Sequence, residues 1–232
     1  QEAEQDSRME RTRHRPVATG EFSKTFAITL SLSLMILGLI FLFNIKLLTA
    51  LLGLSIIVMY NGLYTLVWKK KWTFGAVPGA LPGALPIVMG YSSVNSDIFS
   101  SVCVYLFILM FLWQMPHFWS LAIKYAEDYR KGSFPVLPAV VGSGRTKYHI
   151  SFYIWGYLLL AIMSPLFVYA SYGYFFLVLP MALIMFWRFF VFFKAKGTEG
   201  WLSFFIITNI SMLVFVIAPL FDKWQPILFL ID

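Results

Sequence analysis

Apolar stretches long enough to cross a membrane follow one another along almost the whole chain, and this feature constrains the fold more than any other. A transmembrane helix needs about 20 mostly apolar residues. The sequence predicts seven such spans, at Phe26–Phe43, Leu47–Trp68, Ala76–Tyr91, Ile98–Ile123, His149–Ala170, Tyr174–Phe193 and Phe204–Leu220. We therefore expect an all-α, polytopic transmembrane helix bundle.

The composition supports this fold class. Hydrophobic residues make up 59% of the 232 residues and charged residues only 12%, against about 25% charged residues in a typical soluble domain. A lipid-facing surface accommodates that apolar excess, so we expect membrane lipid around the chain and no nucleic-acid partner. The third span carries Pro78, Pro82 and Pro86, and we expect these prolines to break it.

Basic residues alternate between the two sides of the predicted bundle. Of the 18 lysines and arginines, 16 lie on one side of the predicted bundle. They are in the segment before the first span, in every second loop after it, and at the span ends next to these segments. Seven spans produce that alternation, whereas six or eight would break it. Basic loops collect in the cytoplasm, so we expect the basic side to be cytoplasmic, in a plasma or inner membrane, with the C-terminus across the bilayer.

The opening segment QEAEQDSRMERTRHRP combines carboxylates with arginines. If its first ten residues are helical, Glu2 and Asp6 lie one turn apart on the same face. Such carboxylates suit Mg²⁺, which also takes phosphate oxygens as ligands. Arg11 and Arg15 follow, and guanidinium groups match phosphate oxygens. The alternative is a solvated segment of mixed charge beside the membrane.

Two further charged clusters lie on the same predicted face. Lys69 and Lys70 follow the second span, where lysines often mark topology or contact anionic lipid. Lys124, Asp128 and Arg130 lie where the fourth span leaves the bilayer, where such residues often only anchor the helix. Taken together, carboxylates and cations at the cytoplasmic ends of apolar helices favour an amphiphilic substrate with a diphosphate head.

One histidine lies inside a predicted span. His117 in QMPHFW is about 10 Å deeper than Lys124 at helical rise, and an ionisable residue at that depth indicates a functional site. A neutral imidazole can ligate haem iron or act as a base. The alternative is a histidine hydrogen-bonded within the bundle.

The charged motifs resemble those of a known family. DSRMERTRHRPVATG resembles the first signature of haem O synthases, or protoheme IX farnesyltransferases, in the UbiA-type intramembrane prenyltransferases. Glu2 stands where that signature has an aspartate. YTLVWKKKWTFGAVPGALPGALPIVMGY and QMPHFWSLAIKYAEDYRKGSFPVLP resemble the second and third conserved stretches. At the superfamily's second Asp motif, Lys124 takes the first acidic position and Asp128 keeps the second.

The resemblance implies a nine-helix fold, of which residues 1–232 form a single domain that lacks the first helix and most of the second. It implies Mg²⁺, or Mn²⁺, bound by Glu2, Asp6 and Asp128. It implies that the catalytic residues are Asp6, Asp128, Arg11 and Arg15. The residues expected to bind diphosphate are Arg11, Arg15, Lys69, Lys70, Lys124 and Arg130. We expect Asp6 and Asp128 to face one another across a cytoplasmic-side cavity, with the two arginines at its rim.

The implied reaction transfers a farnesyl group from farnesyl diphosphate to the 2-vinyl group of haem B, and water addition completes haem O. With such a substrate, we expect His117 to contact the haem by iron ligation or by a hydrogen bond, and Phe118 and Trp119 to pack the porphyrin. Contact with haem A synthase is a further possible partnership. One alternative is prenyl transfer to a quinone or chlorophyll precursor, which the PHFW and MERTRHRP strings disfavour. A second is a secondary transporter in which the proline-rich third span lines the substrate path.

Overall fold

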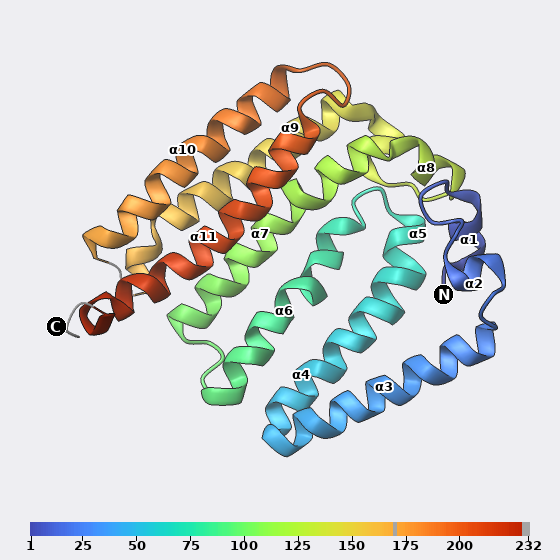
Figure 1. The fold of residues 1–232 in the computed structure, drawn as a ribbon, viewed down its shortest axis with the longest axis horizontal. Helices are drawn as coiled ribbons and strands as arrows, with labels where there is room; N and C mark the ends of the chain where they lie inside the picture. The colour runs from blue at the N-terminus through green and yellow to red at the C-terminus, as the bar shows by residue number, and fades with distance from the viewer. Residues whose placement is uncertain (169–170, 229–232) are drawn as a thin grey trace. The chain divides into compact units, whose positions relative to one another are not determined.

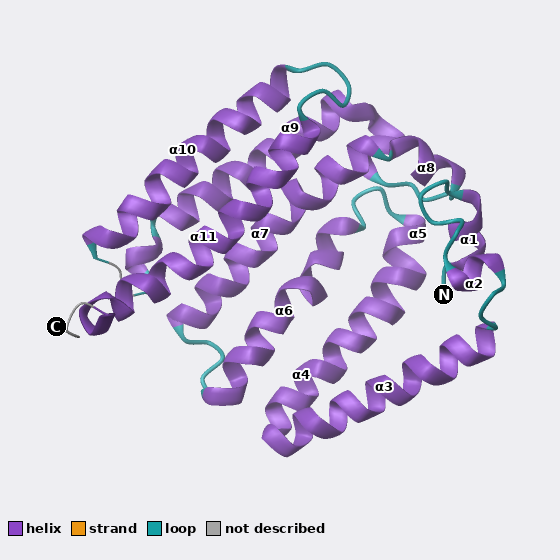
Figure 2. Ribbon diagram, in the orientation of Figure 1, coloured by secondary structure: helices purple, strands orange, loops and turns teal. Residues whose placement is uncertain are grey.

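The computed structural model describes residues 1–168 and 171–228, and every regular element in that part of the chain is helical (Figures 1 and 2). The expected all-α class is confirmed. The chain divides into two compact units, the first formed by Gln1–Ile98 and Tyr125–Val140, the second by Phe99–Lys124 and Val141–Asp232. That residues 1–232 form a single domain stays a prediction.

Unit 1 begins with two short helices and continues with longer apolar ones. Its helices are α1 (Ala3–Arg8), α2 (Pro16–Thr19), α3 (Lys24–Ile45), α4 (Leu47–Ile57), the π-helix η1 (Val58–Trp68), α5 (Lys69–Lys71), α6 (Ala76–Val94) and α8 (Ala126–Lys131). The stretch from α4 through η1 to α5 is one continuous helical rod. A π-helix is rare and often lies near a functional site, and here it leads directly to Lys69.

Buried hydroxyl groups and close glycine contacts join α4 and η1 to α6. The hydroxyls of Thr49 and Ser92 lie 2.9 Å apart. The ring of Tyr64 packs directly on Gly79, where a Cβ atom would lie 2.4 Å from the ring. Polar pairs and small residues are the usual means of packing helices in lipid, and these contacts set the position of η1.

The expected break in the third span is wrong, because α6 is a continuous helix of 19 residues. Pro78 lies in its first turn, where a missing N–H costs nothing. Pro82 and Pro86 lie inside the helix, and each removes one backbone hydrogen bond. Since the three prolines are four residues apart, the missing bonds fall along one face and the rest of the helix remains bonded.

Unit 2 contains four long helices and one short turn. They are α7 (Ser101–Lys124), α9 (Leu137–Ile162), the 3₁₀ turn η2 (Ser164–Leu166), α10 (Tyr172–Lys194) and α11 (Trp201–Leu228). The start of α9 belongs to unit 1, and the helix is interrupted at Gly142, whose φ of 82° lies in the left-handed region. The helix ends shortly before Pro165, because a proline disfavours the helical conformation of the residue before it. Ala170, the predicted end of this span, lies outside the described residues.

Aromatic rings fill the core of unit 2. Phe192 of α10 stacks on Phe204 of α11 with centroids 4.9 Å apart, and the hydroxyl of Tyr157 meets that of Ser211 at 3.1 Å. Lys147 is only 2% exposed; its Nζ lies 4.3 Å from the Phe192 ring centroid. Its ammonium also donates to a backbone carbonyl in the loop after α10. Burial lowers the pKa of Lys147, and the charge of a glutamate in that loop opposes the shift.

Within the described ranges, five helical stretches are long and apolar enough to cross a membrane, which supports an integral membrane protein. They are Lys24–Ile45, Leu47–Lys71, Ser101–Lys124, Gly173–Lys194 and Trp201–Asp222. Helices α6 and α9 occupy the other two predicted positions. Their crossing of the membrane, and with it the count of seven, stays a prediction.

Candidate functional site

The two carboxylates of the opening segment lie on one helical turn, as the sequence predicts. The backbone N–H of Asp6 donates to the carbonyl of Glu2 at 2.8 Å, which places the two side chains on the same face of α1. Asp6 is 8% exposed. Glu4 points elsewhere and pairs with Arg8 at the surface. The segment therefore folds so that Glu2 and Asp6 are sheltered together while Glu4 stays in solvent.

Asp6 is held by an arginine that follows it in the chain. Nη1 of Arg15 donates to both carboxylate oxygens of Asp6, at 3.2 and 3.0 Å. The chain turns back between them, where the buried hydroxyl of Thr12 donates to the Asp6 carbonyl at 3.0 Å. Asp6 and Arg15, both predicted as catalytic, are thus brought together as an ion pair.

Glu2 is held by a lysine from a distant helix. Nζ of Lys69 lies 2.6 Å from Oε2 of Glu2, and the two side chains are 19% and 15% exposed respectively. The other carboxylate oxygen, Oε1, is buried and has no hydrogen-bond partner. A buried oxygen of this kind is costly to leave unpaired, and it offers a ligand position for a cation.

Asp128 and Arg11 also meet, through the backbone of the arginine. The N–H of Arg11 donates to Oδ2 of Asp128 at 3.4 Å. The guanidinium of Arg11 lies instead over two rings, with Cζ 4.7 Å from the Tyr125 centroid and 5.6 Å from the Tyr129 centroid. Helices α1 and α8 are in contact in unit 1, so the two predicted acidic sites share one end of that unit (Figure 1).

The remaining predicted cations are placed differently. Lys70 is half-buried beside Lys69. Arg130 is engaged within its own segment, by Glu127 at 2.6 Å and by a backbone carbonyl. Lys124 belongs to unit 2, where its Nζ lies 5.7 Å from the centroid of Trp201. The structure therefore gathers Arg11, Arg15 and Lys69 around the carboxylates of unit 1.

The predicted metal ligands Glu2, Asp6 and Asp128 do not form a ready-made metal site. In the described ranges, no three His, Cys, Asp or Glu side chains lie close enough together to hold a metal ion. The carboxylates of Glu2 and Asp6 are each paired with a cation instead. Mg²⁺ is commonly held by one or two carboxylates together with substrate phosphates, and the unpaired Oε1 of Glu2 fits that mode. Metal binding by Glu2, Asp6 and Asp128 stays a prediction.

A cavity of about 340 Å³ in unit 1 lies away from these charges. It lies between α3 and α4 and is lined only by apolar side chains, among them Leu39, Phe43 and Leu54. Neither Asp6 nor Asp128 lines it, so it differs from the cytoplasmic-side cavity expected between them. That the two carboxylates face one another across a cavity stays a prediction.

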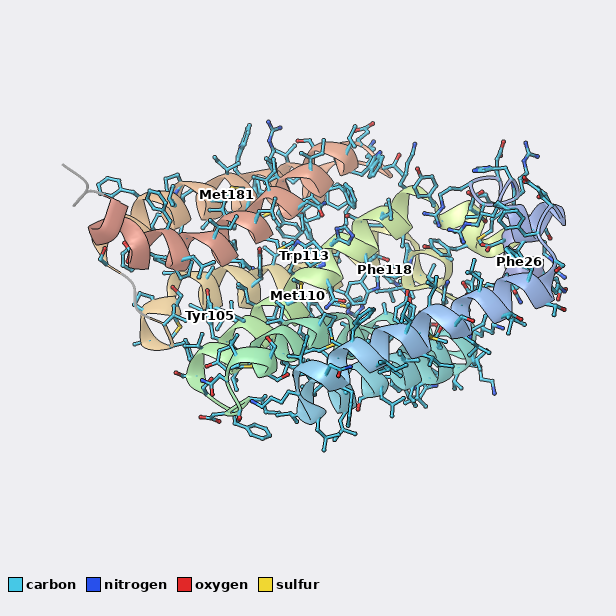
Figure 3. The ribbon with its side chains drawn as sticks, turned by 60° about the horizontal axis from the view of Figure 1, so that its bottom comes forward. Phe26, Tyr105, Met110, Trp113, Phe118 and Met181 are labelled. Atoms are coloured by element: carbon cyan, nitrogen blue, oxygen red, sulfur yellow. The ribbon has the colours of Figure 1, made fainter. Side chains whose placement is uncertain are left out.

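His117 in unit 2 contacts two aromatic rings. Its ring centroid is 4.6 Å from that of Trp113 and 4.8 Å from that of Phe205. Nε1 of Trp113 donates to the carbonyl of Thr208 at 2.8 Å, which joins α7 to α11. Nδ1 of His117 is buried without a hydrogen-bond partner. Trp113 and Phe118 are labelled on α7 in Figure 3.

That Phe118 and Trp119 pack the porphyrin stays a prediction. Trp119 is 1% exposed and packs edge-on against Tyr153 in the core of unit 2. The partners of His117 are instead Trp113, four residues earlier on α7, and Phe205 on α11. Helical spacing predicts contact between residues four apart, so the sequence contained a signal for Trp113 but none for Phe205.

Sequence reasoning also missed three aromatic residues in unit 1. Tyr125 and Tyr129 are four residues apart and contact Arg11. Phe134 lies under Lys69, with Nζ 4.6 Å from the ring centroid. The segment attracted notice for its charges, yet the spacing of its tyrosines was an equally clear signal of a shared helical face.

Fold and site together define a class: a helical membrane protein with carboxylates and cations gathered at one end of a unit of apolar helices, suited to a phosphorylated substrate with an apolar tail. Residues 1–213 match the UbiA prenyltransferase family, and the chain belongs to that family. The family resemblance predicted from the sequence is confirmed.

Relatives named protoheme IX farnesyltransferase cover most of the chain. The protein of Bdellovibrio bacteriovorus is 44% identical over 220 residues, which are 95% of this chain and 75% of that protein. That of Lysinibacillus sphaericus is 35% identical over 208 residues, which are 89% of this chain and 66% of that protein. The chain therefore spans two thirds to three quarters of the length of these relatives.

A solved structure shares the fold. The structure described for digeranylgeranylglyceryl phosphate synthase in membranes aligns with a TM-score of 0.73 and 18% sequence identity. The alignment covers 94% of this chain and 77% of that one. At that identity the likeness concerns the helical architecture alone.

Proposed function

We propose that this protein transfers the farnesyl group of farnesyl diphosphate to the vinyl group of haem B, which yields haem O. The observation that carries the proposal is the 44% identity to a protoheme IX farnesyltransferase across 95% of the chain. The pairing of Asp6 with Arg15 and of Glu2 with Lys69 supports it. Carboxylates are suitable ligands for Mg²⁺, and the two cations are suitable partners for diphosphate oxygens.

In the proposed reaction, the allylic C–O bond breaks and the diphosphate leaves with the electron pair. The vinyl group of haem supplies the electrons for the new C–C bond, so no protein nucleophile is needed. Water then adds to the resulting cation and releases a proton, giving a hydroxyethylfarnesyl substituent. The protein's contribution is to bind the diphosphate, hold the prenyl chain near the vinyl carbon and restrict water.

The ion pairs suggest how the site accepts its ligands. Arg15 and Lys69 neutralise Asp6 and Glu2 in the structure as it stands. A bound Mg²⁺ would neutralise charge on the departing diphosphate. With both bound, Arg15 and Lys69 would hold phosphate oxygens, and Asp6 and Glu2 would hold the cation. Each negative group keeps a positive partner through that exchange.

The haem is expected in unit 2, near His117. The centroids of Trp113 and Phe205 lie 4.6 and 4.8 Å from that of the imidazole, so a haem in contact with His117 would also lie close to these two rings. His117→Ala should shift the Soret band of haem-loaded enzyme if the residue binds iron. It should lower haem affinity at an unchanged band if it only donates a hydrogen bond. Unchanged affinity, spectrum and turnover would show that His117 is a packing residue.

The continuous helix α6 and the distribution of basic residues bear on the transporter alternative and on the membrane side of the site. The transporter alternative needed a broken third span, and α6 is continuous. We place the charged end of unit 1 in the cytoplasm, because the basic residues concentrate on the side of the opening segment. Handover of product to haem A synthase belongs to this proposal as well, and co-purification of the two proteins would test it.

Product analysis tests the proposed function. Membranes containing the full-length protein, given haem B and farnesyl diphosphate, should form haem O by mass. Asp6→Asn should abolish most of this turnover while haem binding stays intact, whereas Glu4→Gln, on the exposed face of α1, should have no effect. Activity should require Mg²⁺ or Mn²⁺. Transfer of the prenyl group only to another acceptor, or full activity in excess chelator, would contradict the proposal.

A further inference from the structure

Three aromatic rings in one short segment hold two of the cations of unit 1. This aromatic platform consists of Tyr125, Tyr129 and Phe134. Arg11 lies over both tyrosines, and Lys69 lies over Phe134. Tyr129 and Phe134 contact each other edge-on, with centroids 6.3 Å apart. Two cations from segments far apart in the sequence therefore rest on one continuous ring surface.

Local backbone structure builds the platform. The N–H of Tyr129 donates to the carbonyl of Tyr125 at 3.1 Å, which puts both rings on one side of α8. After α8 the chain reverses at Ser133, whose φ is +58°, and this turn brings Phe134 back to Tyr129. Gly132 lets the opening segment approach, because a Cβ there would lie 2.9 Å from the sulfur of Met9.

The platform holds its cations without neutralising them. An aromatic face attracts a cation through its quadrupole, and the cation keeps its full charge. Arg15 and Lys69 are each paired with a carboxylate. In the described part of the chain, by contrast, the guanidinium of Arg11 forms no ion pair, and its Nε is buried without a partner. Its guanidinium donates one long hydrogen bond of 3.5 Å to the Tyr129 hydroxyl, among the residues that the structure describes.

We propose that Arg11, held over the rings of Tyr125 and Tyr129, is the fixed anchor for the substrate diphosphate, and that the two tyrosines are positioning residues for it. Arg11 needs no partner exchange before it meets a phosphate, because its charge is not neutralised in the free protein. The ring contacts also restrict its rotamers, which lowers the entropy lost on binding. This inference rests on the proposed function, since it assumes a prenyl diphosphate substrate.

The test separates ring packing from the tyrosine hydroxyl. Tyr125→Leu removes a ring and Tyr125→Phe keeps it. We expect Tyr125→Leu to raise the KM for farnesyl diphosphate about tenfold, with kcat and the KM for haem B within about twofold. Tyr125→Phe should resemble wild type. Trp187→Leu removes the ring under Arg188 in unit 2, 4.6 Å from its Cζ, and should leave all three constants unchanged.

A second background shows whether the effect acts through Arg11. In Arg11→Gln protein, adding Tyr125→Leu should raise the KM no further. Binding of inorganic pyrophosphate with Mg²⁺, measured by calorimetry in nanodiscs, should follow the same pattern. Because this measurement needs no acceptor, it still decides the inference if wild-type protein forms no haem O and the proposed function fails.

Several outcomes would overturn the inference. It fails if Tyr125→Leu leaves both the KM and pyrophosphate affinity unchanged, or if the effect persists undiminished in Arg11→Gln protein. It also fails if Tyr125→Phe is as defective as Tyr125→Leu, because the hydroxyl rather than the ring would then be the important group. Tyr129 is only 6% exposed, so Tyr129→Leu would disturb the fold of the segment. Tyr125→Leu is therefore the main variant, and Tyr129 is tested only as Tyr129→Phe, which keeps the ring.

Discussion

The ion pair between Glu2 and Lys69 should contribute far more to stability than an exposed pair of the same length. Its 2.6 Å separation equals that between Glu127 and Arg130, but the Glu2 and Lys69 side chains are 15% and 19% exposed, against 68% and 50%. Lys69→Met would leave the Glu2 carboxylate buried without any cation, since Oε1 already lacks a partner. Breaking a buried pair in this way costs about 3–5 kcal/mol, whereas an exposed pair contributes at most about 1 kcal/mol.

Hydrogen exchange in nanodiscs can measure this difference at the opening segment. Residual exposure reduces the expected cost of Lys69→Met to about 3 kcal/mol, which corresponds to roughly 150-fold faster amide exchange in α1. Glu127→Gln should change exchange in α8 by less than about fivefold. Adding Glu2→Leu to Lys69→Met should restore most of the protection, because it removes the stranded carboxylate. Equal effects of Lys69→Met and Glu127→Gln would refute the reasoning.

Three further predictions concern stability. Gly79→Ala should lower the free energy of unfolding by about 1–3 kcal/mol, because the added Cβ would meet the Tyr64 ring. Gly90→Ala, which has open space around it, should be neutral or stabilising. The midpoints of thermal unfolding of the two variants test this difference. Asp222 accepts from the backbone N–H and the hydroxyl of Ser171, which caps α10, and from the N–H of Tyr174 in its first turn. Asp222→Ala should therefore cost about 2 kcal/mol and lower the midpoint of thermal unfolding. Because the pKa of Lys147 is lowered in the folded protein, the unfolded state binds more protons between that pKa and the ordinary lysine value. Wild type should therefore gain stability relative to Lys147→Met as pH rises from 7 toward 10; an unchanged difference in midpoints would show that the buried amine does not titrate there.

The sequence by itself determined the helices and the family. Segment length and apolar content are properties of consecutive residues, so they predicted a helix at each of the seven positions. The spacing of Glu2 and Asp6 correctly predicted a shared face, because four residues make about one helical turn. The motif around Arg11 and Arg15 was enough to indicate the prenyltransferase family, which residues 1–213 match.

Only the tertiary structure decided which charges pair and which rings pack. Glu2 and Lys69 are 67 residues apart, and Arg11 and Asp128 are 117 apart. No local periodicity specifies such pairs, since they depend on how the helices pack. The same reason explains why Phe205 was missed as a partner of His117. The prolines of α6 are a different case, because their effect can be worked out from local spacing. Their four-residue spacing puts the lost hydrogen bonds on one face, so the other faces stay bonded and the helix continues.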